Sequence, residues 1–249
     1  MMSWIAGIGY DFRTNNDIFL NSLNVKYYTY GMNTHMSSIM SSEAEKVDML
    51  KRDFGISNAL RYRFTPDFMG KFSVGYDVRL PAESELLGDG YAVAPSGNLL
   101  PERNTSINLG FLFDRTGKSA SNLQLELNTF YGYLENMIRF TGGYLQSQYQ
   151  NFGKMRTLGA EVEVKADLTH WLYGYCNMTY QDLRDVRKFE PNTHVPNPTK
   201  GSRMPNIPYL LANAGLEFHK ENLFGGKMQN TRIFTDGSFA VSYTHLRAH

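Results

Sequence analysis

The sequence predicts an all-β protein: an antiparallel transmembrane β-barrel wall of about ten strands, in which short turns alternate with long extracellular loops. Two observations favour this class. Ten stretches alternate apolar and polar residues one by one, and the connections between them alternate between short and long. Outer-membrane barrels place short turns at one end and long loops at the other, whereas a soluble sandwich has no reason to sort its connections by end.

The composition agrees with a barrel and excludes several other classes. Apolar residues make up 42% of the 249 residues, yet no apolar run is long enough for a transmembrane helix. A barrel strand needs apolar residues only at alternate positions, and the aromatic content of 14% suits one. The formal net charge of +1 indicates no nucleic-acid partner. The single cysteine, Cys176, cannot form an internal disulfide and is interpreted as a small apolar side chain.

Period-2 alternation gives the expected elements. We expect strands near residues 3–12, 19–31, 53–64, 68–79, 104–114, 122–139, 151–166, 171–183, 208–218 and 230–241. Short connections begin at Arg13, Thr65, Phe113, Asp167 and His219, and the mostly long ones begin at Met32, Leu80, Phe140 and Arg184. The long connections 80–103 and 185–207 are rich in Gly and Pro, and loops of this length are usually binding elements or disordered.

The hairpin 53–79 shows the pattern clearly. Its first strand places Phe54, Ile56, Leu60, Tyr62 and Phe64 on one face and Ser57, Ala59, Arg61 and Arg63 on the other. Tyr62, Phe64 and Phe68 flank the Thr65-Pro66-Asp67 turn, where an aromatic girdle would lie. The alternative is a soluble hairpin whose aromatic side chains pack inward. The strand 171–183 is more ambiguous because Tyr173 and Tyr175 occupy its polar face, and the strand 230–241 has the weakest alternation.

The candidate functional residues are charged side chains on the polar faces. Arg61, Arg63, Arg79, Glu161 and Glu163 are predicted to line the lumen or to touch a plug. Glu161 and Glu163 lie two apart on one strand, whereas a retaining glycosidase needs two carboxyl groups that converge across its substrate. We therefore predict no catalytic, cofactor-binding or metal-binding residues. The six histidines lack metal-site spacing, and a haem or metal contact from His35 or His194 is a weaker hypothesis.

Three motifs in order resemble those of TonB-dependent outer-membrane receptors. The run from Asn151-Phe152-Gly153 to Gly159-Ala160-Glu161 resembles a barrel strand of that family, and Arg203-Met204-Pro205-Asn206-Ile207-Pro208 is similar to its Arg-x-Pro-x-x-Pro entry into the next strand. Arg79-Leu80-Pro81 and the later Asn98 to Arg103 segment complete the match, which spans about 79 to 208. The matching positions are Asn98, Pro101, Glu102, Asn151, Gly153, Gly159, Glu161, Arg203, Pro205 and Pro208.

The resemblance implies a large barrel of about 22 strands with a plugged lumen. It implies no enzyme but active import of a scarce nutrient of the iron-siderophore, haem or cobalamin class, in the outer membrane of a Gram-negative bacterium. The implied partners are outer-membrane lipid, the receptor's own plug domain and, through an N-terminal region, the TonB complex that supplies energy. We expect residues 1–241 to form part of the barrel domain, with the plug and the final strands outside this sequence. Residues 242–249 break the alternation and are interpreted as an artefactual tail.

Three alternatives remain open at this point. A passive porin predicts a complete strand set and a constriction loop. A barrel-embedded hydrolase predicts that alanine at Glu161 and Glu163 abolishes a hydrolytic activity. A soluble β-sandwich binding module predicts a chain that stays monomeric without detergent.

Overall fold

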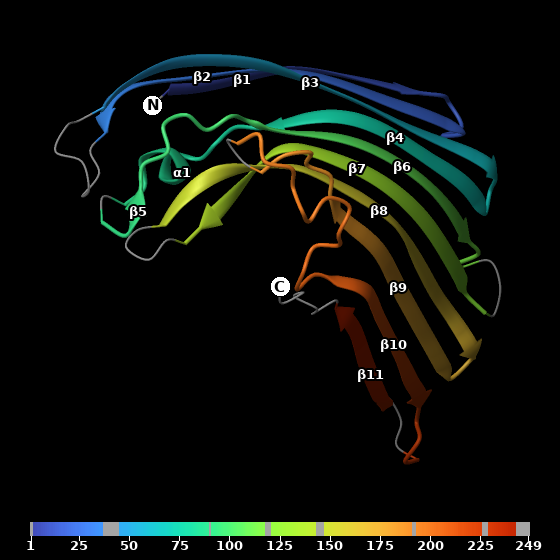
Figure 1. Ribbon diagram of the computed structural model, residues 1–249. Coiled ribbons are helices and arrows are strands. Elements are labelled where there is room, and N and C mark those ends of the chain that lie inside the picture. Colours follow the sequence, from blue (N-terminus) through green and yellow to red (C-terminus); the bar gives the residue numbers. More distant parts are fainter. Residues whose placement is uncertain are drawn as a thin grey trace.

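The computed structural model describes residues 2–36, 45–89, 91–117, 121–142, 147–190, 193–225 and 229–242. These residues form one open, curved sheet in which strands that follow one another along the chain lie side by side (Figure 1). The strand order is β1-β2-β3-β4-β6-β7-β8-β9-β10-β11, and every pair along this path is antiparallel. One further strand, β5, lies off this path and pairs in parallel with β8. The predicted antiparallel barrel wall of about ten strands is therefore confirmed.

The bounds of the elements are as follows. The strands are β1 (Met2–Arg13), β2 (Phe19–Met36), β3 (Glu45–Thr65), β4 (Phe68–Arg79), β5 (Val93–Ala94), β6 (Glu102–Asp114), β7 (Leu123–Thr141), β8 (Ser147–Thr169), β9 (Leu172–Asp185), β10 (Pro208–Glu221) and β11 (Asn230–Ser242). One short helix, α1 (Glu83–Leu87), lies between β4 and β5. No helix among the described residues is long and apolar enough to span a bilayer.

Several strands extend beyond the ranges that the alternation predicts. β2 and β3 continue their ladder from Gly31 paired with Leu50 to Met36 paired with Glu45, and β8 begins at Ser147 instead of 151. Main-chain hydrogen bonds make this extension, and they need no alternation of side chains. The alternation of side chains therefore predicts the part of each strand that has two distinct faces, and it does not predict the continuation of the strand toward the long loops.

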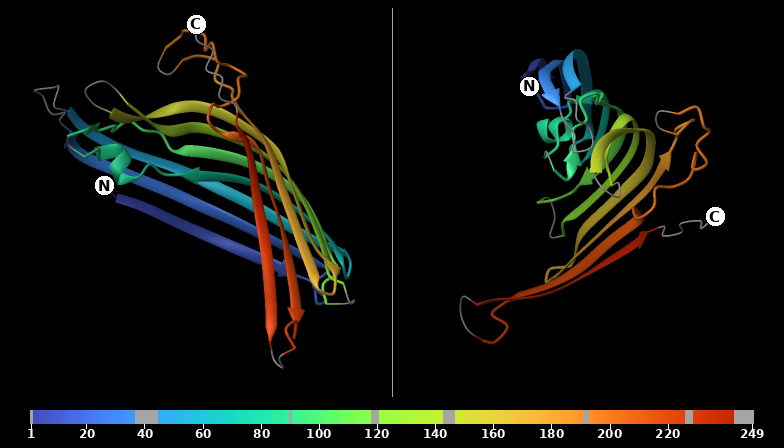
Figure 2. Two further views of the ribbon diagram at one scale, coloured as in Figure 1. Left: turned by 90° about the horizontal axis from the view of Figure 1, so that it is seen from below. Right: turned by 60° about the vertical axis from the view of Figure 1, so that its left-hand side comes forward.

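The connections sort by end as predicted. Short turns join β1 to β2, β3 to β4, β6 to β7, β8 to β9 and β10 to β11, and these turns lie together at one end of the wall (Figures 1 and 2). The starts of β3, β6, β8 and β10 lie at the other end, which we call the mouth. The weak strand β11 is present and ends at Ser242, which pairs with Pro208, whereas residues 243–249 lie outside the described residues.

Each strand presents one polar and one apolar face. We call the face with Arg61, Lys71 and Glu163 the inner face, and the face with Phe72 and Leu158 the outer face. The outer face carries exposed apolar side chains on every strand of the main path, and Leu158 is 53% exposed. A buried hydrophobic cluster lies instead at the mouth, where Met32, Leu86, Leu99 and Ile138 pack together. The strands thus form a wall whose apolar surface faces outward, as a barrel in lipid requires.

Candidate functional site: the mouth and the inner face

The first long connection is fixed to the mouth by a charged group at its start. The Arg79 guanidinium donates from Nε to Glu102 Oε2 at 2.5 Å and from Nη1 to Glu85 Oε2 at 3.0 Å. Glu102 Oε1 also accepts from the Ile138 backbone N–H at 2.6 Å. Burial alone would raise the pKa of Glu102, but these hydrogen bonds outweigh it and the pKa is lowered. Arg79 is thus engaged by its own loop, and its contact with a plug remains a prediction.

Asn151 fixes the far end of the same connection. Its Oδ1 accepts from the Leu100 N–H at 2.8 Å, and its Nδ2 donates to the Leu100 carbonyl at 2.9 Å and to the Asn136 carbonyl at 2.7 Å. A primary amide suits this place because it offers a donor and an acceptor side by side. Asn151 therefore holds Leu100 against β8 through both backbone groups of that residue.

Tyr30 supports the connection from β2. Its hydroxyl donates to the Leu99 carbonyl at 3.1 Å, and its side chain is almost completely buried. Burial, together with the nearby Asp53 carboxylate, raises the pKa of Tyr30 to about 12. With β5 paired to β8 and Leu86 inside the buried cluster, residues 80–101 form a packed element of the mouth. The expected irregular loop is thus more ordered than its composition indicated.

The second long connection is fixed by a buried polar cluster. Asp185 accepts from Arg187 Nη2 at 2.5 Å, from Asn197 Nδ2 at 3.0 Å and from Thr199 Oγ1 at 3.1 Å. Asp185, Arg187 and Asn197 are all buried. Burial alone would raise the pKa of Asp185, but the hydrogen bonds from Arg187 and Asn197 outweigh it and the pKa is lowered. The cluster closes the first half of the 186–207 segment onto the end of β9.

Gly153 makes room for this cluster. Its φ is +118°, and a Cβ at this position would overlap the Arg187 side chain. The Arg187 guanidinium then lies over the Phe152 ring at 3.8 Å, and the Arg139 guanidinium lies 4.9 Å from the same ring. A glycine at this motif position therefore allows both the positive φ and the packing of the Arg187 side chain against the backbone.

The end of the second connection is held by Arg203. Its Nε donates to Asp182 Oδ1 at 2.7 Å, and its Nη2 donates to the Tyr180 hydroxyl at 2.9 Å. Pro208 then begins β10, where a missing N–H does no harm, and its carbonyl accepts from Gln181 Nε2 at 2.8 Å. Five of the ten motif positions are thus anchors of the mouth, namely Glu102, Asn151, Gly153, Arg203 and Pro208. Pro101 is buried beside Glu102, while Asn98 and Pro205 are exposed.

The inner face carries the other predicted residues. Arg61 and Arg63 lie on β3, while Glu161 and Glu163 lie on β8. Lys71 donates to Glu126 at 2.9 Å, and Lys165 pairs with Glu163 at 2.8 Å. Gly159 lies on this face two positions before Glu161, in register with Phe130, and a Cβ there would overlap the Phe130 ring. Gly159 thus admits the close approach of a ring from β7 and of the Tyr180 carbonyl from β9.

Two rows of aromatic side chains cross the outer face. The row near the short turns consists of Phe12, Phe19, Tyr62, Phe64, Phe68, Phe111, Trp171 and Phe218, and several of these rings are in contact. The row near the mouth consists of Trp4, Tyr27, Phe54, Tyr76, Tyr133 and Tyr180. Between them lie exposed apolar residues that include Ile8, Val25, Ile56, Phe72, Val74, Leu127, Leu158 and Val162.

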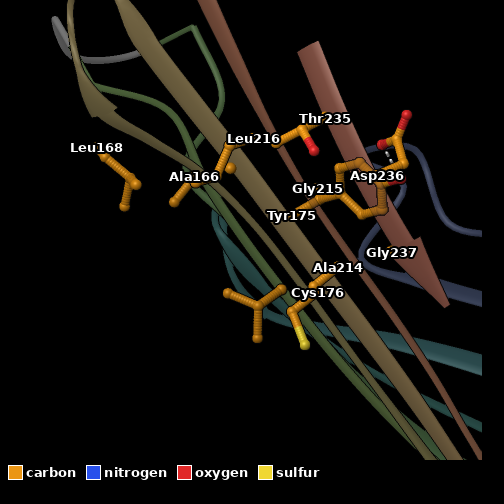
Figure 3. A pocket seen from close by; sticks show the side chains of 12 residues that line it. Ala166, Leu168, Tyr175, Cys176, Ala214, Gly215, Leu216, Thr235, Asp236 and Gly237 are labelled. Carbon is orange, nitrogen blue, oxygen red and sulfur yellow. Dashed lines mark hydrogen bonds between the residues drawn. The ribbon is translucent and has the colours of Figure 1, made fainter. Parts of the chain in front are cut away.

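A hollow of about 460 Å³ lies in the outer face across β8 to β11. Cys176, Ala214 and Leu216 line it, and the Tyr175 hydroxyl donates to Asp236 Oδ1 at 2.6 Å behind Gly215 (Figure 3). Tyr175 thus has a polar partner on the inner face. The described residues contain no group of three or more His, Cys, Asp or Glu that could hold a metal ion. His194 is exposed, whereas the side chain of His35 lies outside the described residues.

An open antiparallel wall with sorted connections, two outer aromatic rows and a polar inner face defines the class of outer-membrane β-barrels. The chain belongs to the family described as "TonB dependent receptor-like, beta-barrel", whose model matches residues 3–247. The resemblance that the motifs indicated is therefore confirmed. No curated protein matches the chain.

Solved structures show the same fold. The copper transporter OprC aligns with a TM-score of 0.67 at 15% identity, over 87% of this chain and 31% of its own. The hemophore receptor HasR of Serratia marcescens, in complex with HasA and heme, aligns with a TM-score of 0.64 at 15% identity, over 97% of this chain and 44% of its own. The ferric yersiniabactin uptake receptor FyuA of Yersinia pestis aligns with a TM-score of 0.64 at 15% identity, over 95% of this chain and 37% of its own. The chain thus spans less than half the length of these structures.

Proposed function

We propose that this chain forms part of the barrel wall of an outer-membrane receptor, and that this receptor imports a scarce nutrient with energy supplied through TonB. The observation that carries the membrane assignment is the pair of aromatic rows. Phe54 and Phe64 lie ten positions apart on β3, which is about 33 Å along a strand. A strand tilted by about 40° then gives a vertical separation of about 25 Å, the height of the apolar band of outer-membrane barrels.

The mouth supports a role in capture. Its two long connections are held by buried ionic and amide contacts, so the surface they present is preorganised, and a preorganised surface binds at a lower entropic cost. The exposed side chains there include Tyr91, Phe189 and Val195. The cargo we propose is of the iron-siderophore, haem or cobalamin class. The names of the similar structures, which include copper, iron and heme proteins, support a metal-bearing nutrient.

The inner face supports a partner inside the bore. We propose that Arg61, Arg63, Glu161 and Glu163 face a plug domain, and that Arg79 shapes the mouth above it. In the receptor, residues 1–241 would contribute barrel wall, the plug would occupy the bore, and the TonB complex would act on the plug from the periplasm. The relatives' names are those of transporters and receptors, which favours this role over an enzyme.

The membrane assignment is tested with the two tryptophans, Trp4 and Trp171, which lie one in each aromatic row. In vesicles with brominated lipids, both should be quenched best by bromine near the headgroups. In a W4F/W171F background, tryptophan at Leu158 should be quenched best by bromine deep in the acyl chains. Quenching of Leu158→Trp by aqueous iodide instead would contradict a lipid-facing outer surface.

The transport assignment is tested in cells that depend on the receptor for one nutrient. Uptake of the cargo should fail both when the receptor gene is removed and when TonB is removed. Uptake that survives the loss of TonB would instead favour a passive porin. Growth on ferric siderophores, haem and cobalamin as separate sole sources would identify the cargo class.

A further inference from the structure

We infer that Arg156, together with Arg184, forms a binding site on the outer face for the phosphate group of a membrane lipid, in the leaflet next to the mouth. The inference rests on the proposed function, because it requires that the outer face lies in lipid. It assigns one defined lipid site, with its chemistry, to that face.

Arg156 lies at the level of the aromatic row near the mouth. On β8 it is the next outward-facing residue after Leu158, about 7 Å closer to the mouth. It pairs in register with Tyr133 on β7, which is a member of that row. Aromatic rows of outer-membrane barrels lie at the boundary between membrane and water, where the headgroups of lipids also lie. The Arg156 side chain therefore starts at the depth of lipid phosphates.

Positive charge exceeds negative charge beside Arg156. Arg156 pairs in register with Arg184 on β9, so two like charges lie directly opposite each other, an arrangement that destabilises a sheet. The Asp182 carboxylate accepts from Arg184 Nε at 2.6 Å and from Arg203 Nε at 2.7 Å. One acid thus serves two arginines, and Arg156 is a third cation next to them.

Arg156 itself has no acidic partner in the part of the chain that the structure describes. Its Nε is buried there and has no hydrogen-bond partner. The neighbouring Lys154 pairs with Glu135 at 2.5 Å, so that carboxylate is already engaged. A donor that has lost water and gained no partner costs free energy, so this nitrogen indicates a missing acceptor.

A lipid phosphate suits the missing acceptor best. Its oxygens accept hydrogen bonds from a guanidinium fork, and its negative charge offsets the repulsion between Arg156 and Arg184. The acyl chains of the same lipid would cover Leu158, which is exposed directly beside the site. A free anion lacks this second, apolar contact. The combination of a cationic pair and an adjoining apolar surface therefore selects a phosphate that is carried by a lipid.

The first experiment measures lipid binding to the protein in detergent micelles. Dioleoyl phosphatidate should bind more tightly than dioleoylglycerol, which has the same acyl chains and no phosphate. R156Q should weaken phosphatidate binding about tenfold or more and leave dioleoylglycerol binding unchanged. The matched control is R52Q, which removes an exposed arginine two positions beyond Phe54 and should leave the affinity within about twofold. Equal binding of the two lipids, or equal loss in R156Q and R52Q, would overturn the inference.

Inorganic phosphate distinguishes a lipid headgroup from a free anion. Phosphate at low millimolar concentration should not displace dioleoyl phosphatidate when the ionic strength is held constant. Displacement that depends on Arg156 would show a small-anion site and would overturn the lipid as the partner.

The second measurement is thermal stability, which separates a lipid site from a merely structural role. Without lipid, R156Q should raise the Tm, because it relieves the repulsion between Arg156 and Arg184 and removes an unpartnered donor. With phosphatidate, the unmodified protein should gain Tm and R156Q should not. A lower Tm of R156Q without lipid would show that Arg156 stabilises the wall itself and would overturn the inference. Its failure leaves the tryptophan depths unchanged, so it is distinguishable from failure of the membrane assignment.

Discussion

Arg61 and Glu161 lie in the same register row of the sheet, four strand spacings apart. The row runs from Arg61 through Lys71, Gly110 and Asn128 to Glu161. Four spacings correspond to about 19 Å along the wall, so the two charges cannot neutralise each other directly. Arg61 and Glu161 therefore present opposite charges at separate places on the inner face.

The buried cluster at Asp185 provides the first prediction. Replacement of Asp185 by Asn leaves the buried Arg187 guanidinium with only the half-exposed Glu190 carboxylate, 3.6 Å from its Nη1, as a counter-ion, and breaking a buried pair in this way costs about 3–5 kcal/mol. We expect the 186–207 segment to open locally, with faster hydrogen exchange there and little change in β3 or β4. The control Glu221→Gln removes a charge at the exposed end of β10 and should leave exchange unchanged. Unchanged exchange in Asp185→Asn would show that the cluster does not hold the segment.

The same cluster predicts a pH dependence. The folded-state pKa of Asp185 is lowered below the ordinary value of about 3.9, so its stabilisation is fully present above that value. As the pH falls through the lowered pKa, the carboxyl group gains a proton and the stabilisation is lost. Exchange of the 186–207 segment should therefore rise between about pH 4 and pH 2 in the unmodified chain. In Asp185→Asn, the exchange, corrected for its intrinsic pH dependence, should stay flat across this range, and a parallel rise would assign the effect to other groups.

Gly153 provides a prediction about backbone strain. Alanine at φ +118° adopts a strained conformation, and its Cβ would overlap the Arg187 side chain. Gly153→Ala should therefore destabilise the mouth by about 1–3 kcal/mol. Gly237→Ala is the control, because a Cβ there meets no heavy atom within 4 Å. Urea unfolding in detergent measures the stability of both variants. Equal stabilities would show that the Arg187 side chain moves to another position without loss of free energy.

The strands and their faces follow from sequence because a side-chain period of 2 is a local property. Phe54, Ile56, Tyr62 and Phe64 share the outer face with no contribution from distant residues. The anchors of the mouth are different, since Tyr30 and Leu99 are 69 positions apart and Asn151 and Leu100 are 51 apart. No local pattern encodes such a pair. The signal that could have found them was the motif itself, because an asparagine and a glycine at fixed places in a strand imply a backbone contact and a special φ.

Asn151 and Asn98 are two motif asparagines in different environments, and replacing each of them provides the next prediction. Both are motif positions, but Asn151 makes three hydrogen bonds to backbone groups, whereas Asn98 is exposed. Asn151→Ala should cost about 1–3 kcal/mol, because it leaves the N–H and carbonyl of Leu100 without their partner. Asn98→Ala should cost less than about 0.5 kcal/mol. Protease cleavage in the 80–101 segment should accordingly increase in Asn151→Ala alone. Equal cleavage of both variants would place the anchor elsewhere.

Cys176 is a native reporter of the outer face. It is exposed and lies between Val164 and Ala214 in register, within the apolar band. In vesicles, a charged maleimide should therefore fail to label it, because the reagent stays in water and the thiol lies in hydrocarbon. After solubilisation in urea, labelling should be complete. The variant C176S/S121C moves the thiol to an exposed position beside a short turn and should be labelled in vesicles permeable to the reagent. Rapid labelling of Cys176 in intact vesicles would place the outer face in water and would contradict the barrel orientation derived from Leu158 and Phe72.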